Sequence, residues 1–252
     1  MDILGIDVGG SGIKGALVNS VTGELVSERH RIPTPSPSTP EAVIQSIAEL
    51  VKILDYHGPI GCGFPALIKD GFIKTAANID KSWINVDTRL TFAPKLGLPF
   101  YVVNDADAAG MAEVMFGAGK DFKGVILLLT IGTGIGSAFF TNGVLLPNTE
   151  LGHIKMFGKS AEKYCSDAVR TKKKLSWKEW AFRFNEYVEY MEFLFSPDLI
   201  ILGGGASKKW DSFNQSLRSK APIVPAMLRN NAGIIGAAAW ALSKIQEEAR
   251  PL

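Results

Sequence analysis

Short apolar runs, separated by glycine-rich or polar turns, recur along the 252-residue chain. The first run, Ile3-Leu4-Gly5-Ile6-Asp7, ends in an acid beside glycines and predicts a buried strand followed by a turn. Apolar or alternating segments predict further strands at 13–19, 24–32, 60–64, 100–104, 124–131, 135–141, 144–147 and 198–202. Thr22-Gly23 predicts the hairpin turn between the second and third strands.

Segments with a helical period of apolar residues lie between these strands. Thr39-Pro40-Glu41 has the form of a helix start, with Thr39 as the N-cap and proline at the first helical position. The helix predicted over 41–55 carries an apolar stripe of Val43, Ile44, Ile47, Leu50, Val51 and Leu54. Further helices are predicted at about 106–115, at 159–169, at 176–195 and near 232–247.

Two segments share one design and indicate an internal duplication. LGIDVGGSGIKGALV at 4–18 and LLTIGTGIGSAFF at 128–140 each contain an apolar strand, a glycine-rich turn and a second strand that enters with Gly-Ile. The duplication predicts two similar α/β lobes that face a cleft, with both glycine turns at the cleft floor. We expect the small lobe to comprise 1–104 and a C-terminal helix at about 237–252, and the large lobe to comprise 105–236.

Composition and charge exclude several classes of protein. The chain is 46% hydrophobic and 21% charged, which supports a large core and argues against disorder. A net charge of +2 without a basic arm argues against nucleic-acid binding. There is no evident secretory signal, and the apolar stretches near 125–129 and 232–242 are shorter than the roughly 20 residues that span a bilayer. We therefore expect a cytoplasmic protein without a membrane partner, with Cys62 and Cys165 as free thiols.

The two glycine turns, DVGGSGIK at 7–14 and TIGTGIGS at 130–137, are candidate phosphate sites. Successive backbone N–H groups in such turns form an anion-binding concavity, to which Ser11, Thr133 and Lys14 would add donors. For either turn alone, a tight hairpin without a ligand is the simpler interpretation. The second turn does not fit a dinucleotide fold, because strand rather than helix is predicted after it, and no Walker A sequence is present.

Acidic and polar residues elsewhere are candidates for binding a hydroxyl group and removing its proton, as transfer of a phosphoryl group to that hydroxyl would require. Asp105 and Asp107 follow an apolar strand and begin a helix, where a carboxylate could act as a general base. For Asp107 we favour a helix N-cap without chemistry, whereas for Asp105 the neighbouring Asn104, together with the family resemblance given below, favours the base. Sugar hydroxyls would be bound by side chains with several donors and acceptors, such as Glu150, His153, Glu162 and Asn78. A structural histidine and a turn amide remain alternatives for His153 and Asn78.

These segments together resemble the ROK family of sugar kinases, and the resemblance is closer still to its polyphosphate glucokinase branch. It covers nearly the whole chain. The segments that carry it are DVGGSGIKGA, TAANIDKSWI, NDADAAGMAE, LTIGTGIGSA, PNTELGHI, LSWKEWA, SPDLIILGGGASKK and PIVPAMLRNNAGIIGAA. The resemblance implies two ribonuclease H-like, actin- or hexokinase-type α/β lobes with a cleft between them, and a homodimer.

The resemblance also implies roles for individual residues. Asp105 matches the catalytic base that deprotonates the 6-hydroxyl of the sugar, and Asp7 would help to hold magnesium. Glucose binding is implied for Asn78, Asn104, Glu150, His153 and Glu162. Phosphate binding is implied for Gly9, Gly10, Ser11, Lys14, Gly132, Thr133 and Gly134. Gly203, Gly204 and Gly205 match the turn that faces adenosine in ATP-using members.

The chain departs from many ROK members in one respect. Those members carry a cysteine-rich zinc motif after the Gly-His, whereas IKMFGKSAEKYCSD follows His153 here, with a single cysteine. Zinc is therefore not expected. Family repressors also carry a helix-turn-helix before the first strand, and this sequence begins directly with that strand, so DNA binding is not expected.

The phosphoryl donor is less sharply indicated than the acceptor. Polyphosphate would need a basic track, and Arg170, Lys172, Lys173, Lys174, Lys208 and Lys209 are candidates for one. A solvated charged face is an equally good interpretation of each cluster. Three alternative functions stay open: an ATP-dependent hexokinase acting on glucose or mannose, a non-catalytic sugar sensor, and a hydrolase of polyphosphate.

Overall fold

The computed structural model describes residues 1–77 and 79–249, and its contacts divide the chain into two compact units. Unit 1 consists of Met1–Ala112 with the chain from Asn231 onward, and unit 2 consists of Glu113–Asn230. One boundary lies within helix α4 (Asp105–Phe116), and the other precedes helix α9 (Ala232–Glu248). The sequence predicts boundaries at 104/105 and 236/237, whereas α4 runs without a break through the boundary between Ala112 and Glu113.

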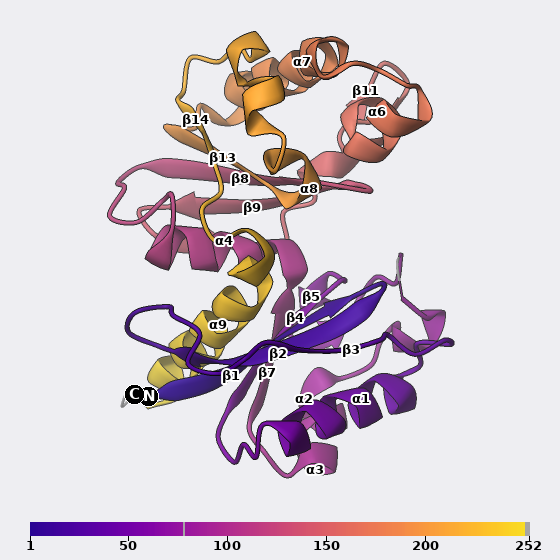
Figure 1. The fold of residues 1–252 in the computed structure, drawn as a ribbon, viewed down its shortest axis with the longest axis vertical. Coiled ribbons are helices and arrows are strands. Elements are labelled where there is room, and N and C mark those ends of the chain that lie inside the picture. The colour runs from indigo at the N-terminus through magenta and orange to yellow at the C-terminus, as the bar shows by residue number, and fades with distance from the viewer. Residues whose placement is uncertain (78, 250–252) are drawn as a thin grey trace. The chain divides into compact units, whose positions relative to one another are not determined.

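Unit 1 is built on a mixed sheet of order β3-β2-β1-β4-β7 (Figure 1). The strands are β1 (Asp2–Gly9), β2 (Gly12–Asn19), β3 (His30–Ile32), β4 (Ile60–Phe64) and β7 (Phe100–Asn104). β1 and β2 form an antiparallel hairpin, whereas β4 and β7 run parallel to β1. The carboxyl ends of β1, β4 and β7 therefore lie at one edge of the sheet, where Asp7 and Asn104 are located.

Helices α1 (Pro40–Ile53) and α9 cover opposite faces of this sheet. Successive residues of β1 point to opposite faces, so neighbouring residues of this strand contact different helices. Thr39 accepts a hydrogen bond from the N–H of Ala42, which makes it the predicted N-cap of α1. The buried stripe of α1 packs with Leu4 on one face. On the other face, Gly5 lets α9 approach β1, since an added Cβ would lie 2.0 Å from the carbonyl oxygen of Ile234.

Shorter elements complete unit 1. They are β5 (Ile68–Lys69), β6 (Phe72–Ile73), α2 (Thr88–Thr91) and α3 (Ala93–Leu96). Three consecutive ring contacts, Phe64 with Trp83, Trp83 with Phe92 and Phe92 with Phe100, join these elements to the sheet. The sequence pattern predicts none of these short elements, because none is long enough to show a hydrophobic period.

Unit 2 repeats the topology of unit 1, with a mixed sheet of order β10-β9-β8-β13-β14. The strands are β8 (Val125–Ile131), β9 (Ile135–Thr141), β10 (Val144–Leu146), β13 (Leu199–Gly203) and β14 (Ile223–Pro225). β8 and β9 form the hairpin, and β13 and β14 run parallel to β8. Each unit is thus a strand hairpin extended by two parallel strands, which is the arrangement that the internal duplication predicts.

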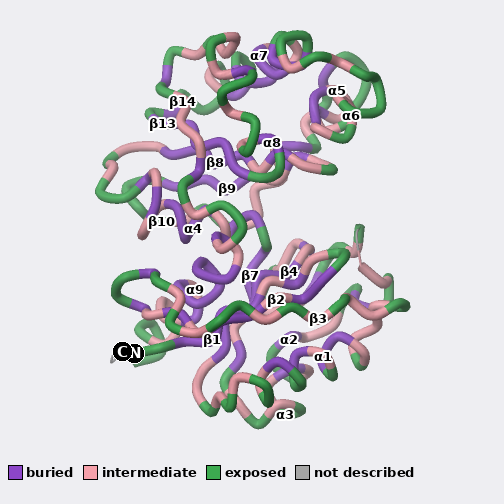
Figure 2. Tube along the Cα trace, viewed as in Figure 1, coloured by how far each residue is buried: buried purple, intermediate pink, exposed green. Residues whose placement is uncertain are grey.

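Helix α7 (Trp177–Phe195) supplies most of the core on one face of the second sheet. It begins at Ser176, which forms a reciprocal capping box with Glu179. Trp180 and Phe184 are fully buried against the central strands, whose burial is visible in Figure 2. The other elements of unit 2 are β11 (Lys155–Met156), β12 (Lys159–Ser160), α5 (Glu162–Cys165), α6 (Asp167–Lys172) and α8 (Gly204–Ser207).

Two predicted elements are wrong in extent. The strand predicted over 24–32 is reduced to β3, because the Ser27 hydroxyl, rather than a backbone carbonyl, accepts the hydrogen bond of the Leu17 N–H. The helix predicted over 159–169 is broken. Phe157 and Gly158 have φ of 50° and 77° and turn the chain between β11 and β12, and Ser166 has extended backbone that separates α5 from α6.

The two cysteines are free, as the sequence predicts, and the structure shows that both are buried. Burial raises the pKa of the Cys62 thiol, with a further contribution from Asp7, and raises the pKa of the Cys165 thiol to about 12. Over residues 1–77 and 79–249, no helix is both long and apolar enough to cross a membrane.

Candidate active site

The first glycine turn is a two-residue hairpin loop. Gly9 pairs with Gly12 at the ends of β1 and β2, so that Gly10 and Ser11 form the exposed loop. The carbonyl of Ser11 accepts a hydrogen bond from the Arg31 guanidinium, and the carbonyl of Gly9 accepts one from the Thr34 hydroxyl, each at 2.5 Å. Protein donors thus occupy two carbonyl oxygens that would otherwise repel an anion at this turn.

Asp7 and Lys14 form an ion pair below this turn. They lie opposite each other in the β1–β2 register, and the Lys14 Nζ atom is 2.9 Å from the Asp7 Oδ2 atom. Both side chains are partly exposed. The Asp7 carboxyl carbon also lies 3.0 Å from the position that a Cβ on Gly233 would take, so the start of α9 closes over this carboxylate.

The Asp7 carboxylate fits a magnesium ion whose other ligands come mainly from the phosphate oxygens of a phosphoryl donor and from water. Mg²⁺ is usually bound by one or two carboxylates, with phosphate oxygens and water supplying the other ligands. Asp7 offers one carboxylate, and Lys14 engages only its Oδ2 atom. Within the described part of the chain, no group of three or more His, Cys, Asp or Glu side chains is placed to hold a metal by itself.

Asn104 and Asp105 lie at the same sheet edge as Asp7. The register pairs Asp7 with Gly63 and Gly63 with Val103, which is two strands away from Asp7. Asp105 follows Val103 by two residues. The Asp105 side chain is exposed at the first position of α4. Strands lie about 4.8 Å apart, which puts the ends of β1 and β7 about 10 Å apart.

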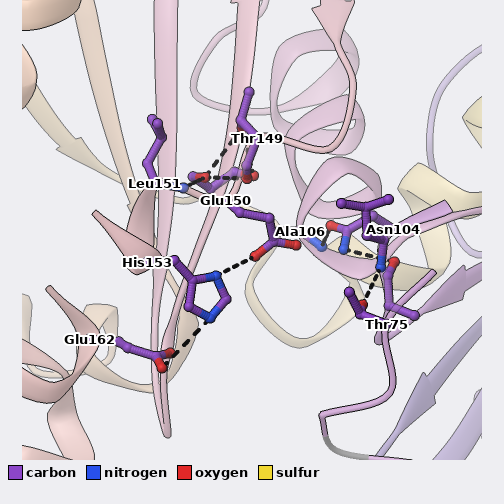
Figure 3. A network of polar contacts seen from close by, with 11 residues as sticks. Thr75, Asn104, Ala106, Thr149, Glu150, Leu151, His153 and Glu162 are labelled. Atoms are coloured by element: carbon purple, nitrogen blue, oxygen red, sulfur yellow. Dashed lines mark hydrogen bonds and ion pairs between the residues drawn. The ribbon is translucent and has the colours of Figure 1, made fainter. Parts of the chain in front are cut away.

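The cap of α4 is Asn104 rather than Asp107. The Asn104 Oδ1 atom accepts hydrogen bonds from the N–H groups of Ala106 and Asp107, and its amide nitrogen donates to the carbonyl of Ala66 (Figure 3). The N-cap interpretation of Asp107 is therefore wrong, since Asp107 lies inside the first turn and is 1% exposed. The bond to the Ala66 carbonyl is the one hydrogen bond that the Asn104 amide nitrogen donates to residues 1–77 and 79–249, so its second hydrogen can donate to a ligand. Asn78 lies outside the described residues.

The second glycine turn is a three-residue loop, in which the Gly132 N–H donates to the carbonyl of Gly134 at 3.0 Å. No atom lies within 4 Å of the position that a Cβ on Gly132 would take, so a ligand can approach the backbone there. The Gly203–Gly205 turn is next to it, because Gly203 pairs with Thr130 and Gly204, at φ 76°, packs on the backbone of Ile131. The candidate phosphate and nucleotide turns of unit 2 thus share one sheet edge.

Three of the candidate sugar-binding residues form one cluster in unit 2. The His153 imidazole lies between two carboxylates, as Figure 3 shows. Its Nδ1 atom is 3.2 Å from the Glu150 Oε2 atom, and its Nε2 atom is 3.8 Å from the Glu162 Oε1 atom. The sequence places Glu150 and His153 three residues apart, and the 3-10 turn Leu151–His153 brings them onto one side.

The charge state of Glu150 depends on both neighbours. Burial raises the pKa of the Glu150 carboxyl above its ordinary value, His153 lowers it, and the negative charge of Glu162 raises it. The cluster therefore brings together two carboxylates that accept hydrogen bonds and one imidazole that can donate or accept them, at a partly desolvated position. Such a group of side chains can bind several neighbouring hydroxyls at once.

Ser137, which the sequence search does not single out, positions this cluster. Its hydroxyl donates to the carbonyl of Thr149 and accepts the N–H of Leu151 at 3.0 Å, on either side of Glu150. Ser137 is 2% exposed and belongs to the second glycine motif. The sequence feature that could have identified Ser137 is a serine at a strand position where the pattern predicts burial, since an alanine would fill such a position without a hydroxyl.

The cluster is in direct contact with the second glycine turn. A Cβ on Gly134 would lie 2.6 Å from the Glu162 Oε2 atom, and a Cβ on Gly152 would lie 2.1 Å from the carbonyl oxygen of Ile135. Glycine at both positions therefore lets the segments that carry Glu150, His153 and Glu162 close onto the turn. The candidate acceptor residues and the candidate phosphate turn of unit 2 form one continuous surface.

Among the basic residues considered for a polyphosphate track, Arg170 pairs with neighbouring side chains, whereas the lysines are exposed. The Arg170 Nε atom is 2.7 Å from the Asp167 Oδ1 atom, and its guanidinium lies over the Trp177 ring at 4.0 Å, so its place is structural. Lys172, Lys173, Lys174, Lys208 and Lys209 are all exposed.

Comparison with known proteins identifies relatives of the whole chain. A family model described as the ROK family matches residues 3–169. The polyphosphate glucokinase of Mycobacterium tuberculosis (strain CDC 1551 / Oshkosh) is 47% identical over 235 residues, which cover 93% of this chain and 89% of that protein.

Solved structures show the same fold. The inorganic polyphosphate/ATP-glucomannokinase from Arthrobacter sp. strain KM superimposes with a TM-score of 0.90 at 47% identity, covering 96% of this chain and 99% of that one. A ROK family glucokinase from Streptomyces griseus, solved in complex with glucose and AMPPNP, gives a TM-score of 0.82 at 24% identity and covers 96% and 100% of the two chains. The α/β fold of the actin and hexokinase type that the sequence predicts is thereby confirmed.

Proposed function

The chain belongs to the ROK family, and we propose that it is a polyphosphate glucokinase, a phosphotransferase that moves the terminal phosphoryl group of inorganic polyphosphate to the 6-hydroxyl of glucose. One observation carries the proposal. The carboxylate of Glu162, which pairs with His153, also touches the second glycine turn at Gly134. Groups that suit a sugar and a backbone that suits phosphate are adjacent within one unit.

Recognition of the acceptor follows from the chemistry of the cluster. The Glu150 and Glu162 carboxylates accept hydrogen bonds from sugar hydroxyls, and His153 can donate or accept with either ring nitrogen. Asn78 and Asn104 are proposed as further glucose ligands because the family resemblance of the sequence implies this role. The buried Ser137 keeps the Glu150 segment in place before the sugar binds.

Asp105 is proposed as the general base. It accepts the proton of the 6-hydroxyl as that oxygen attacks the terminal phosphorus, and the bond from this phosphorus to the bridging oxygen of the donor breaks. Its position at the N-terminus of α4 favours the ionised form that a base requires. The Asn104 cap fixes the start of the helix and thereby the direction of the carboxylate.

Each glycine turn is proposed to bind phosphate groups of the phosphoryl donor. Backbone N–H groups of Gly9, Gly10, Ser11, Gly132, Thr133 and Gly134 and the ammonium of Lys14 stabilise the charge on the phosphoryl group. Asp7 would hold Mg²⁺, which neutralises phosphate charge when bound. The Gly203–Gly205 turn beside Thr130 is proposed to face the adenosine of ATP as a second donor, because the family resemblance of the sequence implies this role.

A coupled assay of glucose 6-phosphate with polyphosphate and ATP as separate donors tests this function. We expect turnover with both donors, and with polyphosphate in particular. Turnover with ATP alone would identify an ATP-dependent hexokinase. Phosphate release without sugar would identify a hydrolase, and binding of glucose without turnover under either condition would identify a sugar sensor.

A further inference from the structure

The Asp7 carboxylate already has a cation as its partner. The Lys14 Nζ atom lies 2.9 Å from the Asp7 Oδ2 atom. Within residues 1–77 and 79–249, no other cationic side chain lies within ion-pair distance of this carboxylate. The start of α9 lies against the other carboxyl oxygen, because a Cβ on Gly233 would be 3.1 Å from the Asp7 Oδ1 atom. A metal ion that reaches Asp7 must therefore share the carboxylate with Lys14 or displace the ammonium.

The ion pair lies on the same face of the sheet as the glycines that close the first turn. Asp7 is opposite Lys14 in the register of β1 and β2, and Gly9 is opposite Gly12 two positions further along. Positions two residues apart in a strand share a face of the sheet. Two residues of a strand span about 6.6 Å, a distance that the flexible four-carbon stem of lysine can bridge. The Lys14 ammonium can therefore move from Asp7 to a phosphate that is bound at the turn.

The charges on this face favour an anion over a free cation. Lys14 is also opposite Arg31 in the register of β2 and β3, and the Arg31 guanidinium donates to the Ser11 carbonyl of the turn at 2.5 Å. Asp7 is thus the one acid in a row with two basic residues. A divalent cation alone would add to an excess of positive charge, whereas the phosphates of a phosphoryl donor bring negative charge together with the metal.

We propose that Lys14 keeps free Mg²⁺ away from Asp7 until a phosphoryl donor binds, so that the metal is taken up only together with the phosphates. This inference rests on the proposed function, in which the first glycine turn binds phosphate groups of that donor. A phosphate at the turn attracts the Lys14 ammonium, which leaves the Asp7 carboxylate free to accept a metal ion. Without the phosphate, the ammonium and the metal compete for one carboxylate.

Lysine suits this exchange better than arginine would. Its ammonium is a compact charge on a flexible stem, whereas a guanidinium would hold the carboxylate in a planar, paired contact. The relative exposures of the Lys14 and Asp7 side chains are 30% and 20%, so water reaches both partners. An ion pair that water reaches is held weakly. The pair can therefore open when a phosphate arrives.

Titration with Mn²⁺, a paramagnetic substitute for Mg²⁺ at oxygen ligands, tests the proposal without glucose and without turnover. The readout is broadening of the backbone amide NMR signals of Val8, which follows Asp7, and Gly63, which is paired with it. In Lys14→Met, these signals should broaden at an Mn²⁺ concentration about 10-fold or more below that for wild type, the usual effect of removing a competing charged hydrogen bond. In the wild-type protein, equimolar inorganic tripolyphosphate should lower the required Mn²⁺ concentration by a similar factor.

Two further variants are controls for this titration. Lys95→Met removes a lysine that pairs with the Glu41 carboxylate at 3.3 Å in the same unit, and it should leave the Mn²⁺ concentration unchanged. Asp7→Asn combined with Lys14→Met should remove the gain, because the site then lacks its carboxylate. If Lys14→Met does not fold, as judged by thermal unfolding, Lys14→Gln takes its place under the same criteria.

Either of two results would overturn the proposal. One is broadening at the same Mn²⁺ concentration in the wild-type protein and Lys14→Met, which would mean that the ammonium does not exclude the metal. The other is a wild-type protein in which tripolyphosphate leaves that concentration unchanged, which would mean that phosphate does not release Asp7.

The titrations also separate this inference from the proposed function. If the wild-type protein does not phosphorylate glucose, but Lys14→Met and tripolyphosphate each promote Mn²⁺ binding as expected, the Lys14 exchange is retained while the glucokinase assignment fails. Normal glucose phosphorylation without a change in either titration would retain the assignment and reject the exchange.

Discussion

The Nδ1 atom of His153 lies 3.2 Å from the Oε2 atom of Glu150, and this contact lowers the pKa of the Glu150 carboxyl. Burial raises the pKa of the Glu150 carboxyl, His153 lowers it, and Glu162 raises it. A raised pKa in the folded state means that the associated stability is present at low pH and is lost as the pH rises through that pKa. Glucose binding has the opposite dependence, because the ionised carboxylate is the better hydrogen-bond acceptor.

We predict that replacing the two neighbours shifts the acid limb of the pH profile in opposite directions. Wild-type kcat/KM for glucose should fall as the pH drops through the raised pKa of Glu150. In Glu162→Gln the repelling charge is gone, so the midpoint should move to lower pH. In His153→Gln the group that lowers the pKa is gone, so the midpoint should move to higher pH.

Both variants weaken binding, so the midpoint and not the absolute rate is the observable. Glu24→Gln, an exposed acid in a turn of unit 1, should leave the midpoint unchanged. Midpoints that move in the same direction in Glu162→Gln and His153→Gln would contradict the arrangement described for this cluster.

Gly134→Ala should impair glucose binding more than folding. The new Cβ would lie 2.6 Å from the Glu162 Oε2 atom, and the flexible end of that side chain can move away. Loss of a charged hydrogen bond costs about 1.5–3 kcal/mol, so KM for glucose should rise about 10- to 100-fold. Isothermal titration with glucose measures this loss. Gly158→Ala is a control for binding: its φ of 77° makes the added Cβ strain the turn, but no neighbouring atom lies within 4 Å, so glucose affinity should be unchanged.

Ser137→Ala should loosen the segment that carries Glu150. The hydroxyl makes hydrogen bonds on both sides of that residue, and its loss leaves the partly buried N–H of Leu151 without this acceptor. We expect a loss of about 1–3 kcal/mol in the free energy of unfolding and a rise in KM for glucose. Urea unfolding and glucose kinetics test both effects. Ser137→Thr keeps the hydroxyl and should recover the glucose KM of wild type. A Ser137→Thr protein that folds normally but does not recover this KM would argue against the role of the hydroxyl.

The two thiols should be unreactive in the folded protein. Burial raises the pKa of both, to about 12 for Cys165, so little thiolate forms at neutral pH and the reagent has no access. A thiol-specific chromogenic reagent should therefore label neither cysteine at pH 7.5 until denaturant is added. Fast labelling of the native protein would show that Cys62 or Cys165 is accessible.

The sequence predicts the parts of the fold whose residues alone determine them. The apolar runs of β1 and β8 are long enough to be recognised as buried strands, and the Thr39 cap locates the start of α1. The 155–160 hairpin is not predicted, because its turn uses Phe157 at positive φ instead of the asparagine or aspartate that usually signals such a turn.

The candidate site shows the same division. Glu150 and His153 are visible as a pair because they are three residues apart, and the structure adds Glu162 to them. Ser137 and Arg31 act through backbone groups of distant segments, so no local pattern identifies them. The capping role of Asn104 depends on where α4 begins, which a shift of one or two residues in the predicted boundary obscures.

The central claim is that Asp105 accepts the proton of the hydroxyl that is phosphorylated. Single-turnover formation of glucose 6-phosphate from polyphosphate, compared between the wild-type protein and Asp105→Asn under saturating glucose, tests it most directly. Loss of a general base predicts a rate lower by about 10²–10⁴-fold, with glucose affinity and thermal unfolding near those of wild type. A folded Asp105→Asn protein that turns over at a rate close to wild type would contradict the account.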